Sequence, residues 1–255
     1  MSKEQQDEVR DFWNRVASDW DQQVGDAGDN NRRLNSDPVL WQFAADVNGL
    51  KVLDAGCGTG YLARQLHQKG ATVTGVDLSE RMIAIARSKS NTIDYQVDSC
   101  TRLQGLADSS FDLLIANYVL MDVPDLEGTI SAFHRVLKPG GAAVLVFSHP
   151  CFSQGDAEVK PGNSGGVSYH WDFNYFETCR RVDPPWGHFK SDFIWFHRPL
   201  SYYWKVFRET GFEVTDFDEP HISPERYQLA ADAQMLRNSR TRPYSVAFRL
   251  VKRIG

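Results

Sequence analysis

A glycine-rich turn between an apolar run and a helical stripe most constrains how this chain can fold. The apolar run that starts at Val52 ends in Asp54, and glycines follow at alternating positions, Gly56, Gly58 and Gly60. Glycine allows positive φ angles and lets a ligand approach the backbone closely. The segment DAGCGTG therefore predicts a strand, a tight turn and a helix N-terminus of the kind that binds nucleotides.

A second apolar run, residues 72–77, ends in another acid, Asp77. In a βαβ unit the carboxyl ends of parallel strands meet at one edge of the sheet, and an acid at the tip of the second strand can bind both hydroxyls of a ribose. Leu78, the next residue, can contact one face of an adenine. We therefore expect a nucleoside-type cofactor to lie across the C-terminal edge of a parallel sheet.

Two more strands are predicted along the same edge. Residues 94–98 end in the polar pair Asp98 and Ser99, which can meet an adenine amino group. Residues 111–117 form a buried apolar run that ends at Asn117, and the segment VLKPGG ends a helix before a fifth apolar run. Alternating strands and helices of this kind are typical of an α/β fold.

In order and spacing, the segments DAGCGTG, GVD, VDS, DSSFDLLIAN and LKPGG resemble those of the class I S-adenosylmethionine (SAM)-dependent methyltransferases. The resemblance is to the small-molecule branch related to quinone-biosynthesis methyltransferases, and it is specific over residues 52–147. It implies a Rossmann-like, doubly wound sheet of seven strands, mostly parallel with an antiparallel last strand. It also implies SAM as cofactor and in-line transfer of a methyl group to an O, N or C atom of a small organic molecule.

The resemblance suggests a place for each part of the cofactor. The three glycines would admit its methionine end, whose amino group Asp54 or nearby carbonyls could hold. Some relatives use an arginine about twenty residues before the glycine turn to pair with the cofactor's carboxylate, and a guanidinium fork suits a carboxylate. Arg32 and Arg33 lie in that window, and Arg33 is our candidate, with a solvated pair of arginines as the alternative. The expected cofactor-binding residues are Arg33, Asp54, Gly56, Gly58, Gly60, Asp77, Leu78, Asp98, Ser99 and Asn117.

Composition excludes several other classes of protein. The net charge of −5 argues against nucleic acid as the main partner, because phosphate binding needs a basic face. No apolar run approaches the ~20 residues of a membrane helix, and the N-terminus lacks the apolar core of a signal peptide. We therefore expect a cytoplasmic protein with a small-molecule substrate and no nucleic-acid or membrane partner. The four cysteines lack CxxC spacing, so we expect reduced thiols and no metal site.

We expect a single methyltransferase domain with four parts. These are a helical N-terminal segment (1–49), the SAM-binding core (50–150), a cap insertion (151–199), and a C-terminal helix with the closing strands (200–255). The N-terminal helix carries Trp13 and Trp20 at helical spacing. Either these rings pack the helix onto the sheet, or the segment folds over the cofactor, as it does in many relatives.

The cap is predicted from its aromatic residues. Residues 151–204 hold 14 of the 31 aromatic residues of the chain, which excludes a solvated linker. The segment could be packed for stability alone, or it could form a dimer surface. We favour a cap that walls a substrate pocket, with dimerisation as a second use; its rings suit an apolar or ring-bearing acceptor and would also attract a cation. The expected substrate-binding residues are Trp20, Tyr118, Trp171, Tyr175, Phe176 and Arg198.

A general base is needed only if the acceptor is a hydroxyl, an ammonium or a carbon acid. His149 ends the fifth strand on the ligand edge, although it could equally bind a backbone carbonyl beside Pro150. His197 could face the pocket or brace the cap, and Glu177 would suit carbon methylation. These three are the catalytic candidates, and the residues do not rank them.

Three other functions remain as alternatives to small-molecule methyl transfer. A SAM-binding sensor or scaffold would keep the cofactor pocket without transfer. A protein methyltransferase would need an open groove under the cap. An NAD-dependent oxidoreductase is disfavoured by the GxGxG spacing, by LKPGG and by the predicted antiparallel end of the sheet.

Overall fold

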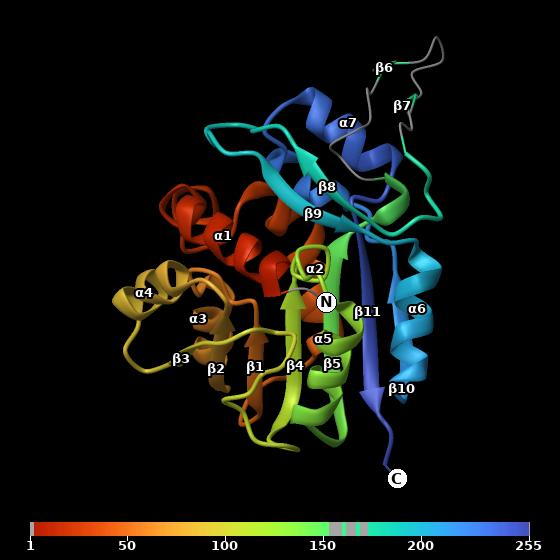
Figure 1. Ribbon diagram of the computed structural model, residues 1–255. Coiled ribbons are helices and arrows are strands. Elements are labelled where there is room, and N and C mark those ends of the chain that lie inside the picture. Colours follow the sequence, from red (N-terminus) through yellow and green to blue (C-terminus); the bar gives the residue numbers. More distant parts are fainter. Residues whose placement is uncertain (1–2, 153–159, 162–166, 169–172, 255) are drawn as a thin grey trace.

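A seven-stranded sheet forms the centre of the molecule (Figure 1). The structure is a computed structural model that describes residues 3–152, 160–161, 167–168 and 173–254. The strand order is β10-β11-β5-β4-β1-β2-β3. The strands are β1 (Lys51–Ala55), β2 (Thr72–Asp77), β3 (Asp94–Val97), β4 (Phe111–Asn117), β5 (Leu137–Ser148), β10 (Phe212–Asp218) and β11 (Ser245–Lys252).

The strand directions confirm the predicted sheet. The pairs β1–β2, β1–β4, β2–β3 and β4–β5 are parallel. The last strand, β11, runs antiparallel to both of its neighbours, β5 and β10. The chain therefore has the Rossmann-like doubly wound sheet with an antiparallel last strand.

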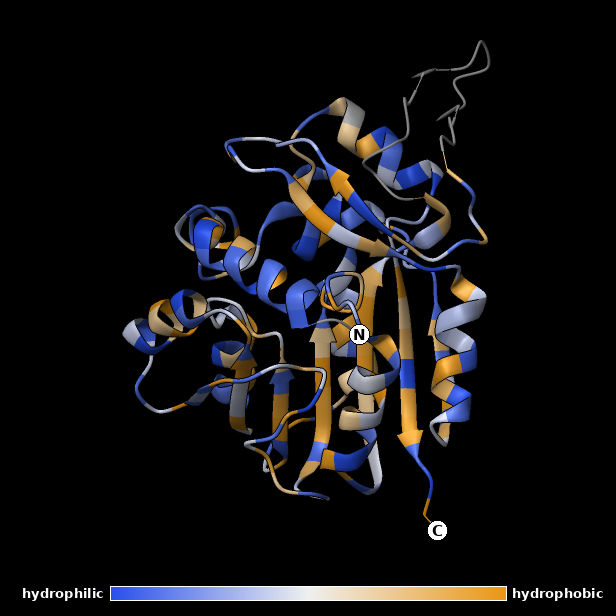
Figure 2. Ribbon diagram, viewed as in Figure 1, coloured by the Kyte–Doolittle hydropathy of each residue, from blue (hydrophilic) through white to orange (hydrophobic). Residues whose placement is uncertain are grey.

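Helices cover both faces of this sheet. Their bounds are α2 (Asp37–Ala44), α3 (Tyr61–Gln68) and α4 (Glu80–Lys89) on one face, and α5 (Leu126–Val136) and α6 (Leu200–Glu209) on the other. Alternate side chains of β4 point to opposite faces, so that Leu113 packs with the first set of helices and Leu114 with the second. Figure 2 shows the result, with strands β4 and β5 mostly hydrophobic between helices that carry hydrophilic outer faces. A parallel sheet buried on both faces needs such continuous apolar runs.

The remaining elements lie beyond the carboxyl ends of the parallel strands (Figure 1). They are the helices α1 (Lys3–Val24) and α7 (Ala233–Thr241), a π-helical turn η1 (Arg32–Ser36), and the 3₁₀ turns η2 (Pro150–Phe152) and η3 (Pro224–Leu229). Two antiparallel ribbons belong here too, β6 (Lys160–Pro161) with β7 (Val167–Ser168), and β8 (Cys179–Asp183) with β9 (Phe193–His197). We call β8, β9 and the turn between them the cap hairpin.

The cap hairpin is bonded to the loop after β4 and to helix α1. The backbone N–H of Phe196 donates to the carbonyl of Met121, in the loop after β4, at 2.7 Å. The guanidinium of Arg180 donates to both carboxylate oxygens of Glu8 on α1, at 3.0 and 2.6 Å. Aromatic rings fill the space between, with Phe12 of α1 packed edge-on against Phe193. The cap hairpin and α1 therefore form one roof over the edge of the sheet.

Among the described helices, none has the length and apolar character needed to cross a membrane. No disulfide joins the four cysteines.

Candidate functional site

The glycine turn has the conformation that its sequence predicts. Gly56, Gly58 and Gly60 all have positive φ, at +73°, +52° and +79°. The backbone N–H groups of Gly56 and Cys57 both donate to the carbonyl of Val76, at 2.7 and 2.9 Å, which ties the turn to β2. The glycines nevertheless differ in their surroundings. A Cβ on Gly60 would overlap the phenol oxygen of Tyr95, whereas the nearest side-chain atom to a Cβ on Gly58 is Trp20 Nε1, at 3.7 Å.

This difference predicts two separable effects of alanine. Gly60→Ala should lower the free energy of unfolding by about 2–5 kcal/mol, because its left-handed φ costs about 1–2 kcal/mol and displacement of the Tyr95 ring adds about 1–3 kcal/mol. Gly58→Ala should cost only about 1–2 kcal/mol for its left-handed φ, while its methyl group points toward the open crevice. Urea unfolding of the two variants tests the ranking, and a larger loss for Gly58→Ala would contradict it.

Asp77 closes the turn from the next strand. Its carboxylate accepts from the backbone N–H of Gly58 and from that of Ser79, each at 2.9 Å. Burial raises the pKa of this carboxyl, and the two N–H groups oppose the shift. Each carboxylate oxygen has a second lone pair. Asp77 can therefore hold the turn and still accept hydrogen bonds from a ligand.

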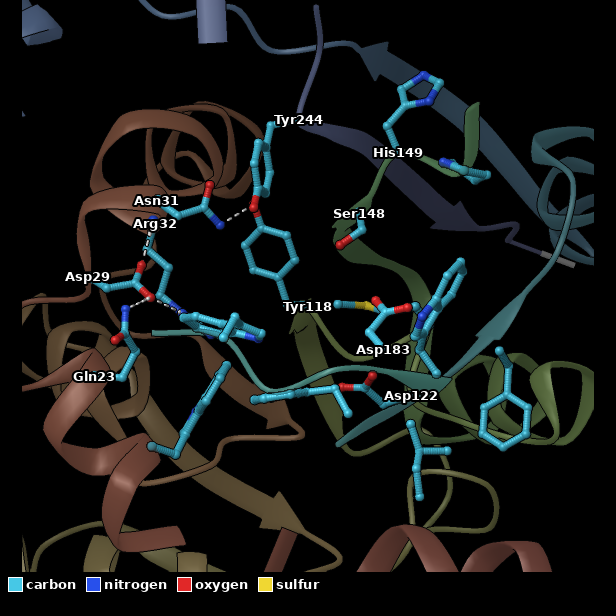
Figure 3. A pocket seen from close by; sticks show the side chains of 18 of the residues that line it. Gln23, Asp29, Asn31, Arg32, Tyr118, Asp122, Ser148, His149, Asp183 and Tyr244 are labelled. Carbon is cyan, nitrogen blue, oxygen red and sulfur yellow. Dashed lines mark hydrogen bonds and ion pairs between the residues drawn. The ribbon is translucent and has the colours of Figure 1, made fainter. Parts of the chain in front are cut away.

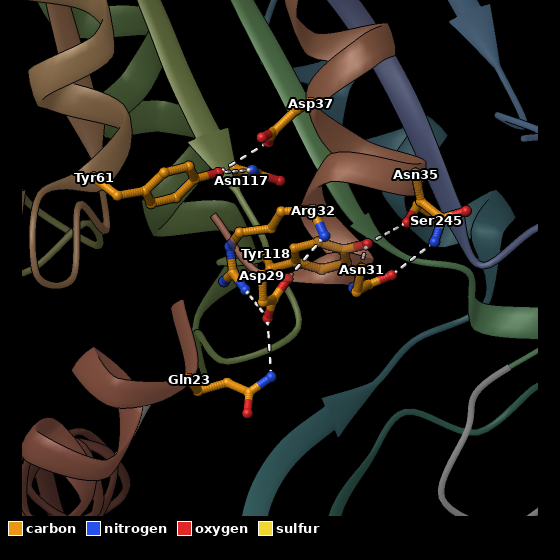
Figure 4. A network of polar contacts seen from close by, with 10 residues as sticks. All are labelled: Gln23, Asp29, Asn31, Arg32, Asn35, Asp37, Tyr61, Asn117, Tyr118 and Ser245. Atoms are coloured by element: carbon orange, nitrogen blue, oxygen red, sulfur yellow. Dashed lines mark hydrogen bonds and ion pairs between the residues drawn. The ribbon is translucent and has the colours of Figure 1, made fainter. Parts of the chain in front are cut away.

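Arg32 lies at the centre of the polar network over the turn (Figure 4). It is 6% exposed, and one of its terminal nitrogens donates to Asp29 at 2.9 Å. The guanidinium stacks over the rings of Trp20, Tyr61 and Tyr118, with centroid distances of 5.0, 5.6 and 5.5 Å. Desolvated cation–π contacts of this kind hold an arginine in one orientation.

A second part of the network orients Asn117, at the end of β4. Its amide nitrogen donates to the hydroxyl of Tyr61 at 3.0 Å, and that hydroxyl donates to Asp37 at 2.9 Å. Tyr118 follows with a left-handed φ of +57°. Its hydroxyl accepts from Asn31 at 3.0 Å and pairs with Ser245 at 2.5 Å. Among the described non-glycine residues with positive φ, Tyr118 is the one that lines the cavities.

Four buried polar atoms around the turn have no hydrogen-bond partner among the residues that the structure describes. They are Arg32 Nε, Asp54 Oδ2, Thr59 Oγ1 and Asn117 Oδ1. All four residues line one small cavity of about 30 Å³, which we call the inner cavity. Burial, and then the charge of Asp77, raise the pKa of Asp54 to about 7. Buried polar groups are rarely left unsatisfied, so these atoms mark the place of a polar ligand or of ordered water.

A middle cavity of about 90 Å³ continues from the inner one along the tips of β2 and β3. Asp77, Leu78 and Ser99 line it, and so do Gly56, Gly58 and Asn117, which also line the inner cavity. The sequence predicted these six as cofactor-binding residues, and the structure brings them together. Their roles stay predictions.

An outer cavity of about 660 Å³ lies under the roof (Figure 3). Rings from three parts of the chain line it: Trp13 and Trp20 of α1, Tyr118 after β4, and Trp186, Phe193, Trp195 and Phe196 of the cap hairpin. Trp20 and Arg32 line all three cavities, so the cavities adjoin one another, and we call the three together the crevice. Of the predicted substrate-binding residues, Trp20, Tyr118 and Arg198 lie at its wall.

The two predicted histidines line the outer cavity but are held by the protein. His149 is 2% exposed, accepts from the N–H of Cys151 at Nδ1 (3.1 Å), and pairs with Glu219 through Nε2 (2.7 Å). Burial lowers the pKa of His149, although Glu219 opposes the shift. His197 Nε2 pairs with the carbonyl of Tyr175 at 2.8 Å. The contact of His197 positions the cap hairpin, and His149 has no ring nitrogen left for a substrate.

Several predicted site residues lie elsewhere and correct the sequence analysis. Arg33 is exposed, because the π-helical turn directs Arg32 inward in its place. Glu177 and Phe176 are exposed too, the latter by 82%, and the hydroxyl of Tyr175 instead contacts Cys151 and the N–H of Leu200. None of these four lines the three cavities. Trp171 lies outside the described residues.

Two more predicted residues make contacts within the protein and do not face a cavity. Asp98 accepts from the N–H groups of Ser99 and Gly105, at 2.7 and 2.9 Å, and Gly60 packs against Tyr95. Neither lines a cavity.

Sequence reasoning missed Asp122, Asp29 and Asn31, which all line the outer cavity. They lie in segments read only as loops, where no periodicity indicates which side chains point inward.

Comparison with known proteins agrees with this geometry. Residues 53–145 match the family model described as a methyltransferase domain. The chain is 37% identical over 105 residues to a ubiquinone biosynthesis O-methyltransferase of Pseudomonas aeruginosa, covering 40% of this chain and 45% of that protein. It is 34% identical over 161 residues to a demethylmenaquinone methyltransferase of Tropheryma whipplei, covering 56% of this chain and 60% of that protein. The matches thus span only about half the length of these curated relatives.

Solved structures extend the likeness beyond the core. The crystal structure of an S-adenosylmethionine-dependent methyltransferase from Mesorhizobium loti superposes with a TM-score of 0.71 at 25% identity, and covers 84% of this chain and 96% of that one. The glycine turn, the acid after β2, the antiparallel last strand and the matched family model all point the same way. The chain therefore carries a methyltransferase domain over residues 53–145 and has the fold of the S-adenosylmethionine-dependent methyltransferases.

Proposed function

We propose that this protein transfers the methyl group of SAM to a small molecule that carries an aromatic or quinone-like ring. The observation that carries the proposal is the set of unpartnered buried atoms in the inner cavity, Arg32 Nε, Asp54 Oδ2 and Asn117 Oδ1. One is a donor with a positive charge, and two are acceptors, one of them on a carboxylate. This set is complementary to an α-amino acid, which presents a carboxylate and an ammonium group together.

The lining of the middle cavity supports a place there for the other parts of the cofactor. The ribose hydroxyls would bind the Asp77 carboxylate, and the adenine would lie against Leu78 and Met82 beside Ser99. The carboxyls of Asp54, Asp77 and Asp122 around the crevice all have raised pKa values, caused first by burial. A ligand that brings an ammonium and a sulfonium would stabilise their ionised forms.

When bound, SAM supplies a methyl group on a positively charged sulfur. The protein's own task is then to hold an acceptor in line and to exclude water. The roof of α1 and the cap hairpin suits that task, because it is bonded both to the loop after β4 and within itself. This attachment favours transfer over a SAM-binding sensor, in which the cap need not seal the crevice.

The aromatic lining of the outer cavity supports a flat, apolar acceptor, since offset and edge-on ring contacts add to the burial of area. Both curated relatives carry names that refer to quinones. A ring-bearing acceptor is therefore the first class to test. The acceptor could be methylated at O, N or C.

Calorimetry with SAM, S-adenosylhomocysteine (SAH) and NADH tests the cofactor assignment. We expect SAM and SAH to bind and NADH not to compete with them. Methyl transfer is then tested with labelled SAM and the ring-bearing probes catechol and 2-hydroxy-1,4-naphthoquinone. Binding of NADH in place of SAH would overturn the proposal, and SAH binding without transfer to any ring compound would favour the sensor.

Asp77→Ala should weaken SAH binding by about 1.5–3 kcal/mol, the range for a lost hydrogen bond to a charged group. Asp98→Ala is the matched control, because Asp98 also accepts from two backbone N–H groups but lines none of the cavities. Calorimetry on both variants separates loss of the ligand contact from loosening of a loop. Equal losses of affinity in the two variants would remove the ribose role from Asp77.

A further inference from the structure

Asp122 lies where the cofactor end of the crevice meets the acceptor end. Both the middle and the outer cavity are lined by Trp13, Trp20, Arg32, Tyr118 and Asp122. Asp122 is the acid of this group, and Figure 3 shows its carboxyl among the residues that line the outer cavity. The transferred methyl group has to cross this junction. A carboxyl here can reach both the methyl donor and the acceptor.

The loop that carries Asp122 is held from several sides. The backbone N–H of Asp122 donates to the carbonyl of Val119 at 2.8 Å. Arg198 donates to the carbonyls of Leu120, Val123 and Pro124, at 3.3, 2.7 and 3.0 Å, and so clamps the loop on both sides of the acid. These bonds hold the backbone on both sides of Asp122, so the loop that carries the carboxyl is ordered before a ligand arrives.

The carboxyl itself is left without a hydrogen bond from the described residues. Its side chain is half-buried, and desolvation raises the pKa of Asp122 well above its usual value. Asp77 raises it further, and Arg32 lowers it. Among the described residues, the other ionisable groups around the outer cavity are Asp29, Tyr118, His149, Asp183, His197, Arg198, Tyr203 and Tyr244. A carboxyl that is poorly solvated is a stronger base once ionised than an exposed one.

We propose that Asp122 is the catalytic proton acceptor, which faces the transferred methyl group and receives the proton of a hydroxyl acceptor. The inference rests on the proposed function and specifies it further as O-methylation. As the acceptor oxygen forms its bond to the methyl carbon, the carbon–sulfur bond breaks and its electron pair stays on sulfur. The proton of the hydroxyl passes to the Asp122 carboxylate, so a phenol, a sulfonium and a carboxylate give an ether, a thioether and a carboxylic acid.

The charge on the cofactor's sulfur links the protonation of Asp122 to the progress of methyl transfer. A sulfonium beside Asp122 favours the ionised carboxylate, which is the form that can accept a proton. After transfer the sulfur is neutral, so the carboxyl regains its preference for the proton. The carboxyl is therefore ionised when a base is needed and protonated when the product leaves.

This coupling can be measured without knowing the acceptor. SAM carries the sulfonium and SAH does not, so the pKa of Asp122 should be lower in the complex with SAM. The ratio of the SAH to the SAM dissociation constant should then rise with pH between those two pKa values, by at most about tenfold per pH unit. We expect this rise in the wild type and in Asp122→Glu, measured by calorimetry from pH 5.5 to 9.

Asp122→Asn should remove the rise with pH in the ratio of the SAH to the SAM dissociation constant. Only the pH dependence that comes from titration of the two ligands themselves should remain. Asp183→Asn is the matched control: Asp183 lines the outer cavity only, so the rise should persist. If wild type and Asp122→Asn give the same pH dependence, Asp122 does not face the methyl group and the inference is overturned. If neither SAM nor SAH binds the wild type, the proposed function itself fails.

Discussion

Replacing Arg32 by glutamine is expected to harm both stability and cofactor binding. Arg32 and Asp29 form a buried ion pair whose side chains are 7% and 8% exposed. Loss of the cation leaves the Asp29 carboxylate without its charged partner, which should cost about 3–5 kcal/mol of unfolding free energy. Loss of the Nε donor should also weaken SAH binding roughly 10- to 150-fold, as for a hydrogen bond to a charged group.

Two further variants separate these effects. Arg33→Gln changes the neighbouring, exposed arginine, and should alter stability by less than about 0.5 kcal/mol. Asp29→Asn combined with Arg32→Gln removes both charges, and should recover much of the stability but none of the SAH affinity. Urea unfolding and calorimetry give both quantities. If Arg33→Gln lost the affinity and Arg32→Gln kept it, the assignment of the carboxylate-binding arginine would be reversed.

Asp54→Asn is expected to change how stability depends on pH. The folded protein raises the pKa of Asp54 to about 7, mainly by burial, so it holds the proton more tightly than the unfolded chain does. The stability that this provides is complete below the unfolded pKa, near 4, and is lost as pH rises through about 7. Relative to the asparagine variant, the wild type should lose about 2–3 kcal/mol between pH 5 and pH 8.

Binding of SAH should lower the pKa of Asp54, which is opposite to the effect of burial. An ammonium group beside Asp54 favours its carboxylate, so SAH binding to the wild type should strengthen from pH 5 to pH 7, and this part of the trend should vanish in Asp54→Asn. Unfolding free energies at pH 5 and 8, with and without SAH, test both statements. A wild type and variant with parallel pH curves would show that Asp54 does not titrate in this range and does not meet the ammonium.

The central part of the fold followed from the sequence because its signals are local. A turn of this kind needs glycines at the positions of Gly56 and Gly58. The acid Asp77 lies at the end of the second strand of the βαβ unit, at a typical distance from the glycine turn. The apolar runs of β4 and β5 are buried on both faces, so their length alone indicates strands of a parallel sheet. These residues meet in the structure because strand tips share one edge.

The arginine that enters the site could not be predicted. Arg32 and Arg33 are adjacent and chemically identical, and only the π-helical turn decides which of them points inward. A π-helical turn has no hydrophobic stripe that reveals it in advance. The same limit applies to Asp122, because its loop is held by Arg198, a residue far away in the sequence.

The cap was predicted as a feature but not in detail. Its aromatic content indicated a folded segment, yet Phe176 is exposed while Trp195 and Phe196 line the outer cavity. The alternation of side chains along a strand does not show which face of the hairpin is buried, because that depends on the elements that pack against it. Helix α7 was missed because its sequence, AQMLRNSRT, has few apolar residues at helical spacing.

A crystal structure of the protein with SAH tests the central claim most directly. We predict that the amino group of SAH bonds Asp54 and Asn117, that its carboxylate bonds Arg32, and that its ribose bonds Asp77. The sulfur should then point toward the junction at Asp122. A complex in which SAH lies elsewhere, or enters with the opposite end at Arg32, would contradict the account.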